Sequence, residues 1–127
     1  MQSPATSGVT GTRVGDCLVV TVTQDLSQGV LEEARRVTLE GIQRDGAKAA
    51  ILELSAVPFM DTHEFEQLRG VVRMAALLGA HAAVVGLRPG IIAHLMSANA
   101  ETAGLRAFLG LDEALLAMAA TDGTSHA

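Results

Sequence analysis

Residues 51–63 read I-L-E-L-S-A-V-P-F-M-D-T-H, and this stretch holds the strongest fold signal in the chain. Its first four residues have the composition of a buried strand, and Pro58 lies in the short loop that follows. Asp61-Thr62 then precedes a segment whose apolar residues recur at helical spacing. The stretch therefore predicts a strand, a loop and a helix that begins at Thr62.

The Asp61-Thr62 pair has two interpretations. Either residue suits the N-cap position, where a side-chain oxygen accepts a hydrogen bond from a free backbone N–H group. Alternatively, Thr62 accepts a phosphoryl group, because free N–H groups and the positive end of the helix dipole both favour a phosphate at a helix N-terminus. Local chemistry alone favours the cap, which is the commoner role.

Helical spacing also predicts which face of this helix is buried. The expected core residues are Phe65, Leu68, Val72, Ala75 and Leu78. The charged residues Glu64, Glu66, Arg69 and Arg73 are expected largely on the other faces, with Glu66 and Arg69 as surface neighbours.

The remaining elements follow from periodicity and from turn residues. Alternation predicts a strand pair over 12–23 with a turn at Gly15-Asp16, and Ser27 is expected to cap a helix that ends at Asp45-Gly46. The inward-facing residues of the strand pair are predicted to be Val14, Leu18, Val20 and Val22. Further strands are expected at 47–54 and 82–85, helices at 62–78, 91–96 and 111–119, and a short strand or ordered loop at 105–109.

This order of elements predicts an α/β fold, with a central mixed β-sheet of four to five strands packed against four helices. A length of 127 residues suits one compact domain. We expect a single domain over residues 12–120, a flexible N-terminal tail over 1–11 and a flexible C-terminal tail over 121–127.

Composition excludes several classes of function. The net charge is −5, the basic residues are scattered, and there is no Trp or Tyr, so nucleic-acid binding is not expected. No apolar stretch is long enough to span a membrane, and the N-terminus lacks the pattern of a secretory signal. The single cysteine, Cys17, lies in an apolar run and is expected to be a buried, inert thiol. Its presence without a disulfide partner suits a reducing, cytoplasmic location.

Motifs for catalysis, cofactors and metals are missing. The sequence has no glycine-rich phosphate-binding loop and no G-x-S-x-G elbow. His63-Glu64 begins like H-E-x-x-H, but Gln67 stands where the second zinc ligand is required. We therefore expect no catalytic residue, no cofactor and no metal site, and an enzyme is the least favoured class.

Two segments together resemble a known family. The first is the strand-loop-helix of Ile51 to Ser55 through Met60-Asp61-Thr62, and the second is Val84-Val85-Gly86-Leu87-Arg88-Pro89 followed by a helix. With these, the chain resembles a STAS domain, the fold of anti-sigma-factor antagonists, from about Val14 to Ala119. The Gly-Leu-Arg-Pro turn is similar to the stressosome branch, the RsbS and RsbR proteins, and the single domain is RsbS-like. Thr in place of Ser after Asp61 is more similar to RsbR.

The resemblance implies a non-enzymatic, phosphorylatable scaffold of a bacterial stress-signalling complex. It implies that the chain sequesters an RsbT-like serine/threonine kinase, releases it on phosphorylation at Thr62, and forms a homo-oligomer (dimer) or a large assembly with RsbR-like STAS paralogues. The residues expected to bind partners are Asp61, Thr62, His63, Glu64 and Arg88. Two alternatives stay open: a simple anti-sigma-factor antagonist that binds an anti-sigma kinase, and a STAS module that binds a small ligand or nucleotide.

Overall fold

The computed structural model describes the backbone of residues 8–124 and the side chains of residues 8–120. Residues 1–7 and 125–127 of the two predicted tails lie outside the described residues. The strands are β1 (Val9–Val14), β2 (Cys17–Val22), β3 (Ala49–Glu53), β4 (His81–Val85) and β5 (Ala107–Phe108). The helices are α1 (Gln28–Gln43), α2 (Thr62–Leu77), α3 (Pro89–Ser97) and α4 (Leu111–Thr124).

The five strands form one sheet in the order β1-β2-β3-β4-β5. Strand β1 is antiparallel to β2, and the other neighbours are parallel, so the predicted mixed sheet is confirmed. The predicted turn joins β1 to β2, and Gly15 adopts a φ of 61°, which glycine tolerates more readily than other residues. The first strand starts at Val9 and α4 continues to Thr124, so the fold reaches into both predicted tails.

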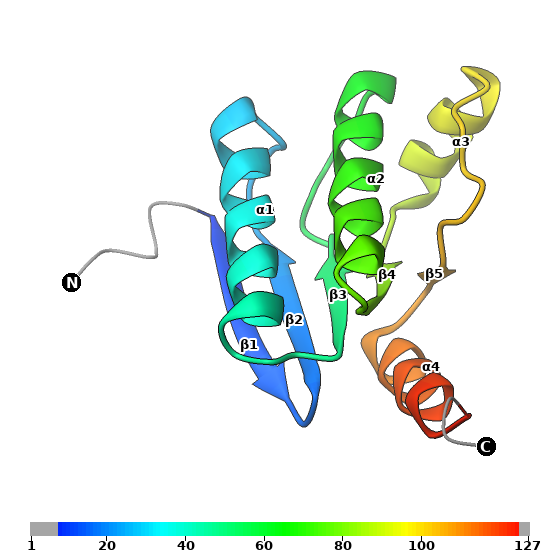
Figure 1. Ribbon diagram of the computed structural model, residues 1–127. Coiled ribbons are helices and arrows are strands. Elements are labelled where there is room, and N and C mark those ends of the chain that lie inside the picture. The colour runs from blue at the N-terminus through cyan, green and yellow to red at the C-terminus, as the bar shows by residue number, and fades with distance from the viewer. Residues whose placement is uncertain (1–7, 125–127) are drawn as a thin grey trace.

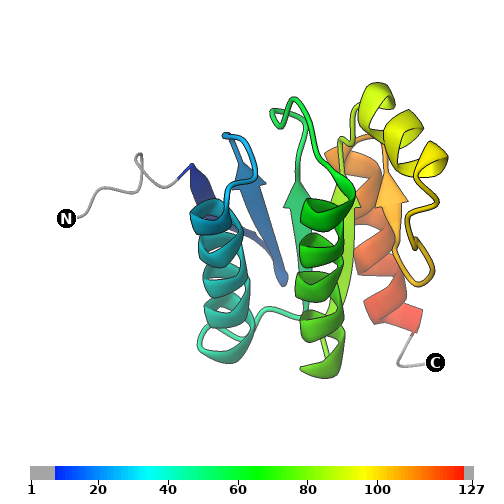
Figure 2. The ribbon, with the colours of Figure 1, turned by 90° about the horizontal axis from the view of Figure 1, so that it is seen from above.

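Helices cover both faces of the sheet (Figures 1 and 2). Helices α1 and α2 lie on one face, and α4 lies on the other, where it contacts β3, β4 and β5. Leu52 of β3 belongs to the core under α1 and α2, whereas its neighbour Ile51 packs in the cluster that includes Met118 of α4. Burial on both faces explains why β3 is an almost continuous apolar run.

Three predicted burial states are wrong, and each has a physical reason. Val14 is 45% exposed because the two-residue turn pairs it with Cys17, which places it on the face opposite to Leu18. Arg69 is buried, although we expected it on an outer face, because the segment after α3 crosses over it. Leu78 is 38% exposed because it is the C-cap residue of α2, where the helical pattern ends.

Candidate functional site

The β3–α2 loop, residues 54–61, lies at the carboxyl edge of the parallel strands, where α2 and α3 begin (Figure 2). Two buried side chains and a backbone hydrogen bond fix the position of this loop. Val57 and Met60 are fully buried, and the N–H of Val57 donates to the carbonyl of Leu54 at 2.9 Å. Pro58 and Phe59, between these anchors, are exposed. The loop therefore has a fixed path that ends at Asp61.

Asp61 is the N-cap of α2 and forms a capping box with Glu64. The carboxylate of Asp61 accepts from the backbone N–H of Glu64 at 2.7 Å, and Glu64 Oε1 accepts from the backbone N–H of Asp61 at 3.0 Å. The capping role therefore belongs to Asp61 and not to Thr62. Both carboxylates are committed to the helix start.

Thr62 is the first residue of α2, and its side chain is exposed. Its hydroxyl makes no hydrogen bond with any residue in the described part of the chain. His63, next along, is exposed as well. A free hydroxyl thus stands at the positive end of a 16-residue helix, in a setting that favours a bound or attached phosphate.

The turn between β4 and α3 packs against the start of the β3–α2 loop. Gly86 has a φ of 82°, and a Cβ there would lie 2.9 Å from Ser55 Cβ and 3.0 Å from Ser55 N. Ser55 Oγ donates to Glu53 Oε1 at 3.0 Å. The two segments that carry the family resemblance are therefore in direct contact, and Gly86 permits this close approach.

Arg88 connects the same two segments. Its Nε donates to the carbonyl of Ser55 at 3.1 Å, and the residue is exposed. The residue is also the N-cap of α3, with Pro89 in the first turn, where its missing N–H costs little. Arg88 thus bonds to the β3–α2 loop, which leads to Asp61 and Thr62. It also faces solvent, so a partner could reach it.

The sequence prediction missed the apolar part of this surface. Phe59 is 53% exposed, and its ring lies 5.3 Å from that of His94 of α3. Ile92 and Met96 on α3 are exposed too. The only sequence signal was a phenylalanine in the middle of a loop, and only the folded chain brings α3 beside it.

The charged groups around Thr62 are mainly acidic. Asp61 and Glu64 form the cap, and Glu66 accepts from Arg69 Nη1 at 2.9 Å. Arg69 also donates to the carbonyl of Ala103 at 3.2 Å, and its side chain is buried, so its guanidinium does not face solvent beside Thr62. The helix start therefore presents negative charge next to an open hydroxyl.

The described residues contain no group of three or more His, Cys, Asp or Glu side chains that could hold a metal ion. Among them there is also no helix long and apolar enough to cross a membrane. Cys17 lies at the opposite edge of the sheet, and burial raises the pKa of its thiol, against a smaller opposing effect of Arg13. Cys17 is thus buried, as predicted from its apolar setting.

The fold and this loop define a small α/β domain with an exposed hydroxyl at a helix N-terminus. Residues 9–114 match the STAS domain family, so the chain belongs to that family. No curated protein matches the chain in sequence.

Solved structures share the fold at low sequence identity. A serine-to-glutamate variant of RsbS from Moorella thermoacetica is 23% identical, with a TM-score of 0.76 over 90% of this chain and 97% of that one. A chain from the stressosome, described as a signal integration and transduction hub, is 20% identical, with a TM-score of 0.71 over 89% and 98%. The unphosphorylated anti-sigma factor antagonist SpoIIAA is 14% identical, with a TM-score of 0.63 over 85% and 94%.

Proposed function

We propose that this chain is an RsbS-like, non-enzymatic scaffold of a bacterial stressosome that sequesters an RsbT-like serine/threonine kinase and releases it when Thr62 is phosphorylated. The observation that carries the proposal is the exposed Thr62 hydroxyl, which the capping box leaves uncommitted. The likeness to RsbS and to a stressosome chain supports the choice of complex. The kinase supplies ATP and Mg²⁺, since this sequence contains neither binding motif.

Release follows from charge. A phosphate on Thr62 adds roughly −1.5 to −2 charges at neutral pH. The helix N-terminus accommodates it, but Asp61 and Glu64 already make this region negative, while the charge of Glu66 is paired with Arg69. A kinase docked over the helix start then meets a higher local charge and a larger desolvation cost, so it dissociates. In this proposal His63 and Arg88 line the same docking surface.

The test is kinase binding by purified variants. Thr62→Asp should weaken binding of the RsbT-like kinase by at least about tenfold, because an added carboxylate without a partner is costly to desolvate in an interface. Thr62→Ala should bind like the unmodified chain. Thr102→Asp, at another exposed threonine, is the matched control and should leave binding unchanged. Equal binding of the kinase by Thr62→Asp and Thr62→Ala would show that charge at Thr62 does not control kinase release.

The likeness to SpoIIAA supports a second candidate, a simple anti-sigma-factor antagonist that binds one anti-sigma kinase. The two candidates differ in size of assembly. The scaffold should co-assemble with RsbR-like STAS paralogues into a very large cytoplasmic particle, whereas the antagonist should form only a dimer or a small complex with its kinase. Size-exclusion chromatography with light scattering of the mixed proteins separates them.

A further inference from the structure

A cavity of about 320 Å³ opens at the amino ends of β2, β3 and β4, between the β1–β2 hairpin and α4. This edge of the sheet is opposite to the one that carries Thr62, because Thr62 follows the carboxyl end of β3. Helix α4 contacts β3, β4 and β5. Figure 2 shows it behind β4 and β5, away from β1 and β2, so the hairpin side of the same face is less covered. The cavity lies at that boundary.

The walls of this cavity are apolar. Cys17, Ala49 and Met118 are nearly fully buried and form its floor, and Val14 and Leu115 stand at its sides. The short side chain of Ala49 leaves the space unfilled. Cys17 contributes a wall rather than a reactive group, since its burial keeps the thiol neutral. An alkyl chain is the chemistry that suits such walls.

The rim carries the ammonium of Lys48, the imidazole of His81 and the carboxylate of Asp16. Lys48 and His81 are held side by side, because the backbone N–H of His81 donates to the carbonyl of Lys48 at 3.0 Å. The Lys48 ammonium makes no hydrogen bond or ion pair with the other described residues. Asp16 is the lining residue with a carboxylate, and it lies 4.0 Å from the guanidinium of Arg13. An ammonium that has no partner among the described residues, beside an apolar cavity, favours an anionic head group.

We propose that this groove binds a small amphipathic anion, with an unbranched alkyl chain against Cys17 and Met118 and an anionic head at Lys48. The volume is at the lower end of the roughly 300–1,000 Å³ of small-molecule sites, so the chain is short. The site is separate from Thr62 and does not depend on the proposed kinase partnership.

Calorimetric titration with octanoate, 1-octanol and octylamine tests the choice of head group. Octanoate should bind saturably, and octylamine should bind at least about tenfold more weakly, because a charge-assisted hydrogen bond to the ammonium is lost. Lys48→Met should weaken octanoate binding by a similar factor and leave 1-octanol unchanged. Absence of saturable octanoate binding, or equal affinity for all three probes, would overturn the proposal.

A second measurement locates the site. With methyl-labelled methionine, octanoate should shift the NMR signal of Met118 and not that of Met96, which lies on α3. Ala119→Leu should fill the groove and abolish binding, whereas Ala120→Leu, one residue further along α4, should not. Shifts at Met96 alone, or octanoate binding that survives Ala119→Leu, would contradict the assignment. A dimer of the chain that Ala119→Leu dissociates would also contradict the assignment, because a second copy of the chain would then cover the groove.

Discussion

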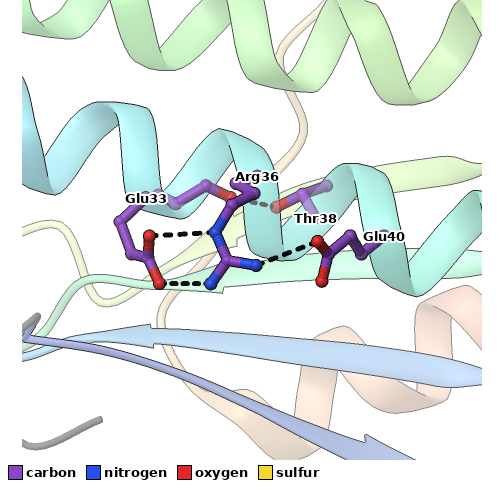
Figure 3. Close-up of polar contacts among 5 residues, drawn as sticks. Glu33, Arg36, Thr38 and Glu40 are labelled. Carbon is purple, nitrogen blue, oxygen red and sulfur yellow. Dashed lines mark hydrogen bonds and ion pairs between the residues drawn. The ribbon is translucent and has the colours of Figure 1, made fainter. Parts of the chain in front are cut away.

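Helices α1 and α2 have the same length, 16 residues, and cover the same face of the sheet, yet they use their polar side chains differently. In α1, Arg36 lies between Glu33 and Glu40 and pairs with both (Figure 3). Thr38, on its buried face, donates to the carbonyl of Ala34 at 2.8 Å. Helix α1 thus satisfies these groups internally.

Helix α2 commits its first carboxylates to the cap and leaves a threonine beside them without a partner. Asp61 and Glu64 satisfy two backbone N–H groups, and Thr62 keeps an exposed hydroxyl. The comparison shows that a stable helix start and a site open to a partner can occupy adjacent residues. The cap holds the backbone in place, and this fixes where the hydroxyl stands.

The largest difference between the two helices should appear when the N-cap side chain of each is removed and the free energy of unfolding is measured. Asp61→Ala should lower the free energy of unfolding by about 1–2 kcal/mol, and Ser27→Ala by about half as much, since Ser27 makes one longer bond, 3.3 Å, to the N–H of Val30. Urea unfolding measures both. Thr62→Ala should stay within about 0.5 kcal/mol of the unmodified chain, because its hydroxyl bonds to nothing in the described structure. A large loss for Thr62→Ala would mean that Thr62 is structural.

A glycine in each helix gives the next contrast. A Cβ on Gly70 of α2 would meet open space, so Gly70→Ala should raise the free energy of unfolding by about 0.5–1 kcal/mol. On Gly41 of α1 it would lie 2.4 Å from Cδ2 of the buried Leu18, so Gly41→Ala should lower that free energy by about 1 kcal/mol. Thermal or urea unfolding gives both values. The same sign for the two variants would contradict the packing described for α1.

The smallest effect should come from the Glu33–Arg36 pair. Hydrogen bonding to Arg36 lowers the pKa of Glu33 from its ordinary value. The pair therefore stabilises the fold fully above the ordinary glutamate pKa of about 4.3, and this contribution is lost as the pH falls through the lowered pKa.

Unfolding measured at pH 7 and pH 3 checks this effect. Arg36→Met should reduce the pH dependence of stability slightly, and the neighbouring Arg35→Met should not. The difference should vanish in 1 M salt, where the Debye length is about 3 Å. A difference that persists in high salt would point to packing of Arg36 rather than to its charge.

The fold could be predicted from the sequence because its local signals agree. Ser27, Gly15 and Pro89 each occupy the cap, turn or helix start that their chemistry favours, and the apolar run of β3 marked the centre of the sheet. The face of Val14 was predicted wrongly because alternation was carried through a two-residue turn without pairing the residues across it.

The candidate site could be predicted only in part. The sequence placed Asp61 and Thr62 at a helix start, but it could not decide which residue caps the helix, since both side chains suit that position. The Arg88 bond to Ser55 and the inward turn of Arg69 toward Ala103 join residues far apart in the chain. Local patterns carry no information about such contacts.

The most direct test of the proposed switch is intact-mass and peptide mass spectrometry after incubation with the RsbT-like kinase and Mg²⁺-ATP. We expect one added phosphate, located on Thr62, and no phosphate on the Thr62→Ala variant. Kinase that binds the chain but leaves Thr62 unmodified, or that phosphorylates another residue equally in Thr62→Ala, would contradict the proposal that Thr62 is the phosphoryl acceptor.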